Sequence, residues 1–138
     1  MTKDLHRKVH NVSHFQVSLV RSGSPLHDFA VGGVLVNVTA TEINVATAWD
    51  DNGRVAPEVE ISVTGFEVPA VDAFPPLIPI TSAIFEVTDG GVEVGNWISG
   101  DVAKVAVPPG RYHVLVSMDS LEPMTARRVH FHFWPHPA

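Results

Sequence analysis

The amino-acid sequence predicts an all-β fold: a single-domain, jelly-roll-like β-sandwich of about eight to nine mostly antiparallel strands. Three observations support this prediction. Apolar residues recur with a period of two in many short segments, which places alternate side chains on one face of a strand. Turn residues separate these segments. No segment of ten or more residues shows the 3.6-residue apolar period of an amphipathic helix.

The first half of the chain contains four expected strands, at 14–21, 33–40, 42–49 and 58–64. The second and third are rich in β-branched residues and only a short Thr-Ala-Thr link separates them, so we expect a hairpin. In EVEISVT (58–64), Glu58, Glu60 and Ser62 alternate with three aliphatic residues. This pattern indicates a strand with one buried and one solvent-facing side.

The second half opens with a proline-rich segment, GFEVPAVDAFPPLIP (65–79). We interpret it as a long crossover loop, because proline cannot donate to a sheet ladder. Five further strands are expected at 80–87, 92–98, 103–107, 111–117 and 127–134. The basic N-terminal segment 1–10 and the proline-containing tail 135–138, which includes His136, are expected to be loosely ordered.

The length and composition fit one globular domain that spans residues 1–138. The absence of cysteine excludes a disulfide scaffold, a thiolate zinc site and a cysteine nucleophile. The N-terminus is positively charged but lacks the apolar region of a secretory signal, and no stretch approaches the ~18 apolar residues of a membrane span. We therefore expect a soluble, cytoplasmic protein.

The net charge of −6 is concentrated in residues 42–101, called the acidic middle below, which hold eleven acidic residues and one basic residue, Arg54. Such a segment disfavours direct binding to nucleic acid and suits a protein partner with a basic surface. A solubilising surface is the alternative interpretation. The sequence contains no G-x-S-x-G, phosphate-binding loop or dinucleotide-binding fingerprint, so we expect a protein that is not an enzyme and has no cofactor.

The segment RRVHFHFW (127–134) combines histidines with aromatic residues. On a strand, His130 and His132 share one face while the phenylalanines share the core-facing side, so we expect an outer, solvent-facing histidine row. The alternative is a metal- or small-ligand-binding site in which His113, on a neighbouring strand, joins His130 and His132, since imidazole is a common zinc ligand. A further alternative is a structural module that pairs with a second subunit through this last strand and so forms a homo-oligomer.

The segment TAWDDNGRV (47–55) places Trp49, Asp50 and Asp51 at the end of a strand and in the loop that follows. Its spacing matches a calcium-binding loop poorly, and a turn with Gly53 at positive φ is the simpler interpretation. Because tryptophan is over-represented among interface hot spots, the segment is also a candidate contact surface for a partner.

Region 80–119 begins with a strand and an Asp-Gly turn. A second strand follows and ends near Trp97. The next motif is VAVPPGRYHVLV (105–116), in which a Pro-Gly turn leads to a tyrosine expected in the core. In this order the region resembles the C-terminal half of the competence-protein-J family, inhibitors of a bacterial DNA-entry nuclease. NVSHFQVSLV (11–20) is similar to that family's opening strand, so the resemblance covers about residues 11–134.

The resemblance implies a bacterial, competence-related nuclease inhibitor, and it transfers no catalytic residues to this chain. An inhibitor can occupy the cationic groove of a nuclease with carboxylates, which accelerates association. We therefore predict a partner-binding surface made of four carboxylates and one aromatic anchor. These residues are Asp50, Asp51, Glu58, Glu60 and Trp49.

Overall fold

The structure is a computed structural model that describes residues 2–12, 16–24, 36–48, 57–69, 77–122 and 125–137. These described residues form ten strands and no helix. The strands are β1 (Lys3–Asn11), β2 (Gln16–Arg21), β3 (Val36–Val38), β4 (Glu42–Ala46), β5 (Glu58–Gly65), β6 (Ile78–Val87), β7 (Val92–Asn96), β8 (Asp101–Val105), β9 (Gly110–Met118) and β10 (Arg128–Pro135). The described part of the chain therefore offers no helix that is long and apolar enough to cross a membrane.

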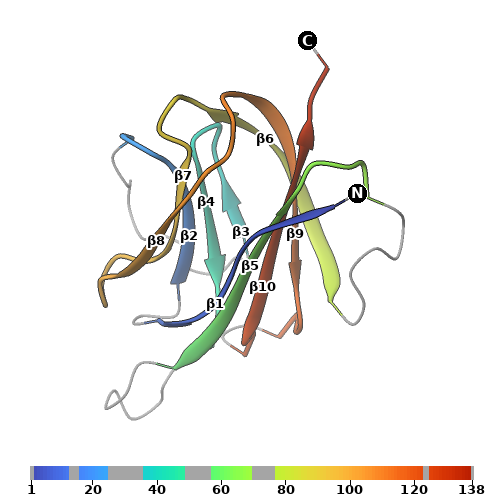
Figure 1. The fold of residues 1–138 in the computed structure, drawn as a ribbon. Coiled ribbons are helices and arrows are strands. Elements are labelled where there is room, and N and C mark those ends of the chain that lie inside the picture. Colours follow the sequence, from blue (N-terminus) through green and yellow to red (C-terminus); the bar gives the residue numbers. More distant parts are fainter. Residues whose placement is uncertain are drawn as a thin grey trace.

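The strands form two five-stranded sheets that face each other across one core (Figure 1). Sheet A has the order β1-β5-β10-β9-β6, and sheet B has the order β3-β4-β2-β7-β8. Every pairing is antiparallel except that of β10 with β5. The predicted all-β sandwich of mostly antiparallel strands is thus confirmed, and so is the predicted hairpin, formed by β3 and β4.

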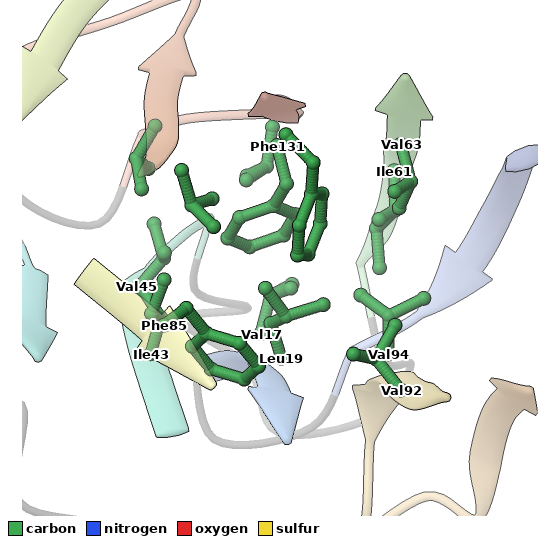
Figure 2. Packing of buried hydrophobic residues seen from close by; sticks show 14 of the residues in the cluster. Val17, Leu19, Ile43, Val45, Ile61, Val63, Phe85, Val92, Val94 and Phe131 are labelled. Carbon is green, nitrogen blue, oxygen red and sulfur yellow. The ribbon is translucent and has the colours of Figure 1, made fainter. Parts of the chain in front are cut away.

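Alternate side chains of both sheets meet in the core. Figure 2 shows aliphatic residues of β2, β4, β5 and β7 around Phe85 of β6 and Phe131 of β10. The ring of Phe133 packs edge-on against Phe85 and Tyr112, with centroids 6.1 and 5.6 Å apart. The predicted core tyrosine, Tyr112, donates its hydroxyl hydrogen to the carbonyl oxygen of Pro108 over 2.7 Å. Each buried aliphatic or aromatic side chain contributes roughly 1.5–3 kcal/mol to folding.

The N-terminal segment corrects one prediction, because residues 3–11 form the regular strand β1. Backbone pairing with β5 holds this strand at the edge of sheet A. A register irregularity between Asp4 and His6 interrupts its alternation, and the positions that pair with core residues of β5 then carry His6, Lys8 and His10. The segment therefore lacks the apolar period that would have revealed a strand.

The C-terminal tail is also more ordered than predicted. The backbone N–H of His136 donates to the carbonyl oxygen of Arg111 over 2.9 Å. Its imidazole lies against that of His113, with ring centroids 4.6 Å apart. The proline-rich segment is shorter as a loop than predicted, since β6 begins at Ile78 and accommodates Pro79 at a register irregularity on the edge of sheet A.

Both open sides of the sandwich are bridged between the sheets. On one side, the backbone N–H of Asn11 in β1 donates to Oδ2 of Asp101 in β8 over 2.8 Å. On the other side, the backbone N–H of Glu86 in β6 donates to the carbonyl oxygen of Ala40 over 2.8 Å. These contacts tie edge strands of sheet A to sheet B and make the sandwich barrel-like.

Candidate functional site

The predicted partner-binding surface is described only in part. Trp49, Asp50 and Asp51 lie outside the described residues. Glu58 is exposed at the start of β5, as the alternation predicted. Glu60 shares its face but is half-buried, and its Oε1 lies 3.5 Å from Nη2 of Arg7 and 3.4 Å from Nε of Arg128. Arginines on both neighbouring strands thus compensate the charge of this carboxylate.

Several other acids of the acidic middle are also engaged within the chain. Glu86 forms ion pairs with Arg21 and Arg111. Glu42 is 3% exposed and its Oε2 accepts a hydrogen bond from Nδ2 of Asn44 over 2.6 Å. The amide oxygen of Asn44 in turn accepts hydrogen bonds from the side chains of Gln16 and Ser18, so Glu42 belongs to a buried polar network.

Three further acids of this region, Glu58, Asp89 and Glu93, form no ion pair with the described residues. Glu58 and Asp89 are exposed, and Glu93 is half-buried. They lie on three different elements: the start of β5, the turn that follows β6, and β7. The carboxylates available to a basic partner are therefore fewer than the sequence count implies.

The histidines of β10 lie on the outer face of sheet A, as predicted, but the prediction that they face solvent is wrong. His130 is 3% exposed and His132 is 0% exposed. Nε2 of His132 is 2.7 Å from the carbonyl oxygen of Glu67, in the segment that follows β5. This segment therefore reaches over the outer face of the sheet, and alternation alone gave no sign of such a cover.

The two histidines share the hydroxyl of Thr64, and the hydrogen bonds run in one direction. Nε2 of His132 must donate, because the Glu67 carbonyl only accepts. Nδ1 of His132 then accepts from Oγ1 of Thr64 over 2.7 Å. The same hydroxyl oxygen is left to accept from Nε2–H of His130, also over 2.7 Å. We call His130, Thr64, His132 and the Glu67 carbonyl the histidine chain.

This direction requires a neutral His132, because Nδ1 of that ring accepts a hydrogen bond, and the electrostatics favour the neutral form of both imidazoles. Burial is the largest cause that lowers the pKa of His130 to about 4, and the nearby His132, Arg7 and Arg128 act in the same sense. Burial also lowers the pKa of His132. Near neutral pH the histidine chain is thus uncharged and buried, which is the condition of a structural network.

His113 lies apart from this pair. Trp134 lies between them, with its ring stacked 5.0 Å from that of His113 and 5.9 Å from that of His132. Among the described residues, no group of three or more His, Cys, Asp or Glu side chains is arranged to hold a metal ion. His130 and His132 thus form hydrogen bonds with the Thr64 hydroxyl, whereas His113 stacks on Trp134.

The position of β10 corrects the alternative in which the last strand pairs with a second subunit. This strand is internal to sheet A, between β5 and β9, so both of its hydrogen-bonding edges are used within the chain. A second subunit has no free edge on the last strand with which to pair.

The sequence did not lead us to predict the roles of Thr64 and Asp101. Thr64 continues the outward row of Glu58, Glu60 and Ser62, so the alternation in β5 was an available signal. Asp101 had no such signal, because its contact with His10 joins residues far apart in sequence.

Comparison with known proteins identifies the fold. No protein-family model matches the sequence, and no curated protein matches it significantly. The crystal structure of ComJ, inhibitor of the DNA degrading activity of NucA, from Bacillus subtilis superposes with a TM-score of 0.64 at 12% identity, covering 99% of both chains. A structure described as crocagin biosynthetic gene J gives a TM-score of 0.65 at 11% identity, again covering 99% of both chains. The chain therefore has the fold of these two proteins over nearly its full length, as the sequence resemblance implied.

Proposed function

We propose that this chain is a non-enzymatic binding protein that inhibits a DNA-degrading nuclease. The observation that carries the proposal is the superposition on ComJ, an inhibitor of the DNA-degrading activity of NucA, over 99% of both chains. Fold alone does not specify function, and many binding roles share a sandwich. The local sequence resemblance and the acidic middle supply two independent reasons to favour inhibition over those other roles.

The inhibitory surface in this proposal centres on Trp49, Asp50, Asp51 and Glu58. These residues are close in sequence, and Glu58 is exposed and free of ion pairs with the described residues. Glu60 belongs to the proposed surface too, but it contributes less free charge because it lies between Arg7 and Arg128. Carboxylates presented to a basic groove accelerate association, and salt screens that effect.

The test measures degradation of DNA by purified NucA and by any nuclease encoded beside the gene of this chain, with increasing amounts of the purified protein. We expect saturable inhibition of at least one of these nucleases at a fixed stoichiometry. Association, followed by stopped-flow or surface plasmon resonance, should slow by about tenfold or more as ionic strength rises. Unchanged DNA degradation at saturating protein in every case would refute the proposal.

Matched charge reversals test the surface itself. The double variant Asp50→Lys, Asp51→Lys should lower the association rate by about tenfold. The control Asp89→Lys, Glu93→Lys changes the net charge equally, in the turn after β6 and in β7, at residues that do not belong to the proposed surface. Equal effects of the two double variants would show that only net charge matters, and the assignment of the surface would then be wrong.

A further inference from the structure

Two histidines of β1 converge at the side of the sandwich where β1 approaches β8. Nε2 of His6 lies 2.9 Å from Nε2 of His10. Their ring centroids are 5.1 Å apart and their planes are tilted by 55°. His10 is fully buried, whereas His6 is half-buried and open to solvent on one side. The Nε2 atoms of His6 and His10 therefore face each other near the surface.

Asp101 fixes the orientation and the tautomer of His10. Nδ1 of His10 is 2.9 Å from Oδ1 of Asp101 and 3.2 Å from its carbonyl oxygen. Both neighbours only accept, so Nδ1 carries a hydrogen, and Nε2 is the ring nitrogen that faces His6. A carboxylate on the far nitrogen is the arrangement that orients most metal-ligating histidines in proteins.

The position of Asp101 is itself constrained by its neighbours. Its Oδ2 accepts the backbone N–H of Asn11 over 2.8 Å, and its own N–H donates to Oγ of Ser99 over 3.3 Å. Gly95 lies directly against the carbonyl oxygen of Asp101, where any Cβ would overlap it. Asp101 is therefore a built support for His10 and not a loose surface carboxylate.

We propose that His6 and His10 bind a divalent cation of the Zn²⁺ class through their Nε2 atoms. Without metal, these two nitrogens share one hydrogen. Two ligands of one tetrahedral zinc, each about 2.0–2.1 Å from the ion, are about 3.3 Å apart. A turn of the half-exposed His6 ring then aims both Nε2 lone pairs at a common point. The cation takes the place of the shared hydrogen, which is released to solvent, and each ring keeps one hydrogen on Nδ1.

The surrounding charges define what kind of site this is. Lys8 lies between the two histidines on the same face of β1 and opposes a cation, whereas the Asp101 carboxylate behind His10 favours one. No third His, Cys, Asp or Glu side chain of the described ranges completes the set. Water or a donor from a bound molecule therefore takes the remaining positions.

Calorimetric titration of untagged, chelator-treated protein with ZnCl₂ at pH 7.5 tests the proposal. We expect one Zn²⁺ per chain. His6→Ala should abolish this saturable binding, and Asp101→Asn should weaken it by about 10- to 100-fold. His113→Ala is the matched control, because it removes another half-buried imidazole that lies in the ring stack with Trp134. This control should bind as the unmodified protein does.

A second measurement needs no substitution and stays decisive if a variant fails to fold. Long-range ¹H–¹⁵N spectra of the unmodified protein should show that Zn²⁺ shifts the Nε2 signals of His6 and His10. Three results would overturn the proposal: no saturable binding by the unmodified protein, equal loss of binding in His113→Ala, or Zn²⁺-induced shifts confined to other histidines.

Discussion

Replacing Thr64 by valine should destabilise the protein because one hydroxyl serves both histidines of the histidine chain. Valine has nearly the same shape, so the change removes the hydroxyl and little else. Nε2–H of His130 then loses its acceptor and Nδ1 of His132 loses its donor, each from a 2.7 Å hydrogen bond. Both groups are buried. Leaving one buried polar group unsatisfied costs about 1–3 kcal/mol, so the expected loss for these two groups is about 2–6 kcal/mol.

Thr64→Ser is the matched control for this prediction. Serine keeps the hydroxyl and loses one methyl group, which costs about 1 kcal/mol. Equilibrium unfolding in guanidinium chloride, followed by far-ultraviolet circular dichroism, measures the free energy of unfolding of both variants. The valine variant should be the less stable of the two. If the valine variant matched or exceeded the serine variant in stability, the hydroxyl would not be the link that the geometry indicates.

Two further predictions concern protonation and backbone geometry. The pKa of His130 is about 4 in the folded protein and near 6.5 when unfolded, so the unfolded state binds more protons between these values. Stability should therefore fall as pH decreases from about 7.5 to 4, by on the order of 3 kcal/mol, in denaturant unfolding at stepped pH, and His130→Asn should flatten that slope. Gly95→Ala should cost about 3 kcal/mol or more, because Gly95 has φ 144° and a Cβ would overlap the Asp101 carbonyl. Gly23→Ala, at φ 87° with open space around it, should cost only about 1 kcal/mol. Thermal unfolding of the two glycine variants measures both costs, and equal costs would contradict this reasoning.

The fold was predictable from the sequence because most strands bury one face. In β5 and β10, aliphatic and phenylalanine side chains alternate with polar ones, and the structure places the apolar rows in the core. In β1 the rule fails for a physical reason. The irregularity between Asp4 and His6 shifts the alternation, and the positions that pair with core residues of β5 then carry His6, Lys8 and His10, of which His10 is buried and Lys8 is exposed.

The surroundings of the histidines were much less predictable. Alternation correctly assigned His130 and His132 to the outer face of sheet A, but a face is exposed only if nothing covers it. The contact of His132 with the carbonyl oxygen of Glu67 shows that another segment does. Likewise, the pairing of His10 with Asp101 joins two strands that are distant in sequence. Local periodicity contains no information about either contact.

The contacts within the chain reduce the negative charge that the acidic middle can present to a partner. A sequence count treats all of its carboxylates as equivalent sources of negative potential. In the structure, Glu60 and Glu86 each contact two arginines, Glu42 is buried in a polar network, and Asp101 holds His10. Paired charges largely cancel beyond about one Debye length, roughly 8 Å at physiological salt, so they contribute little to steering a distant partner. Recognition by charge must then depend on the unpaired carboxylates, and the salt dependence of association measures how many of them the partner meets.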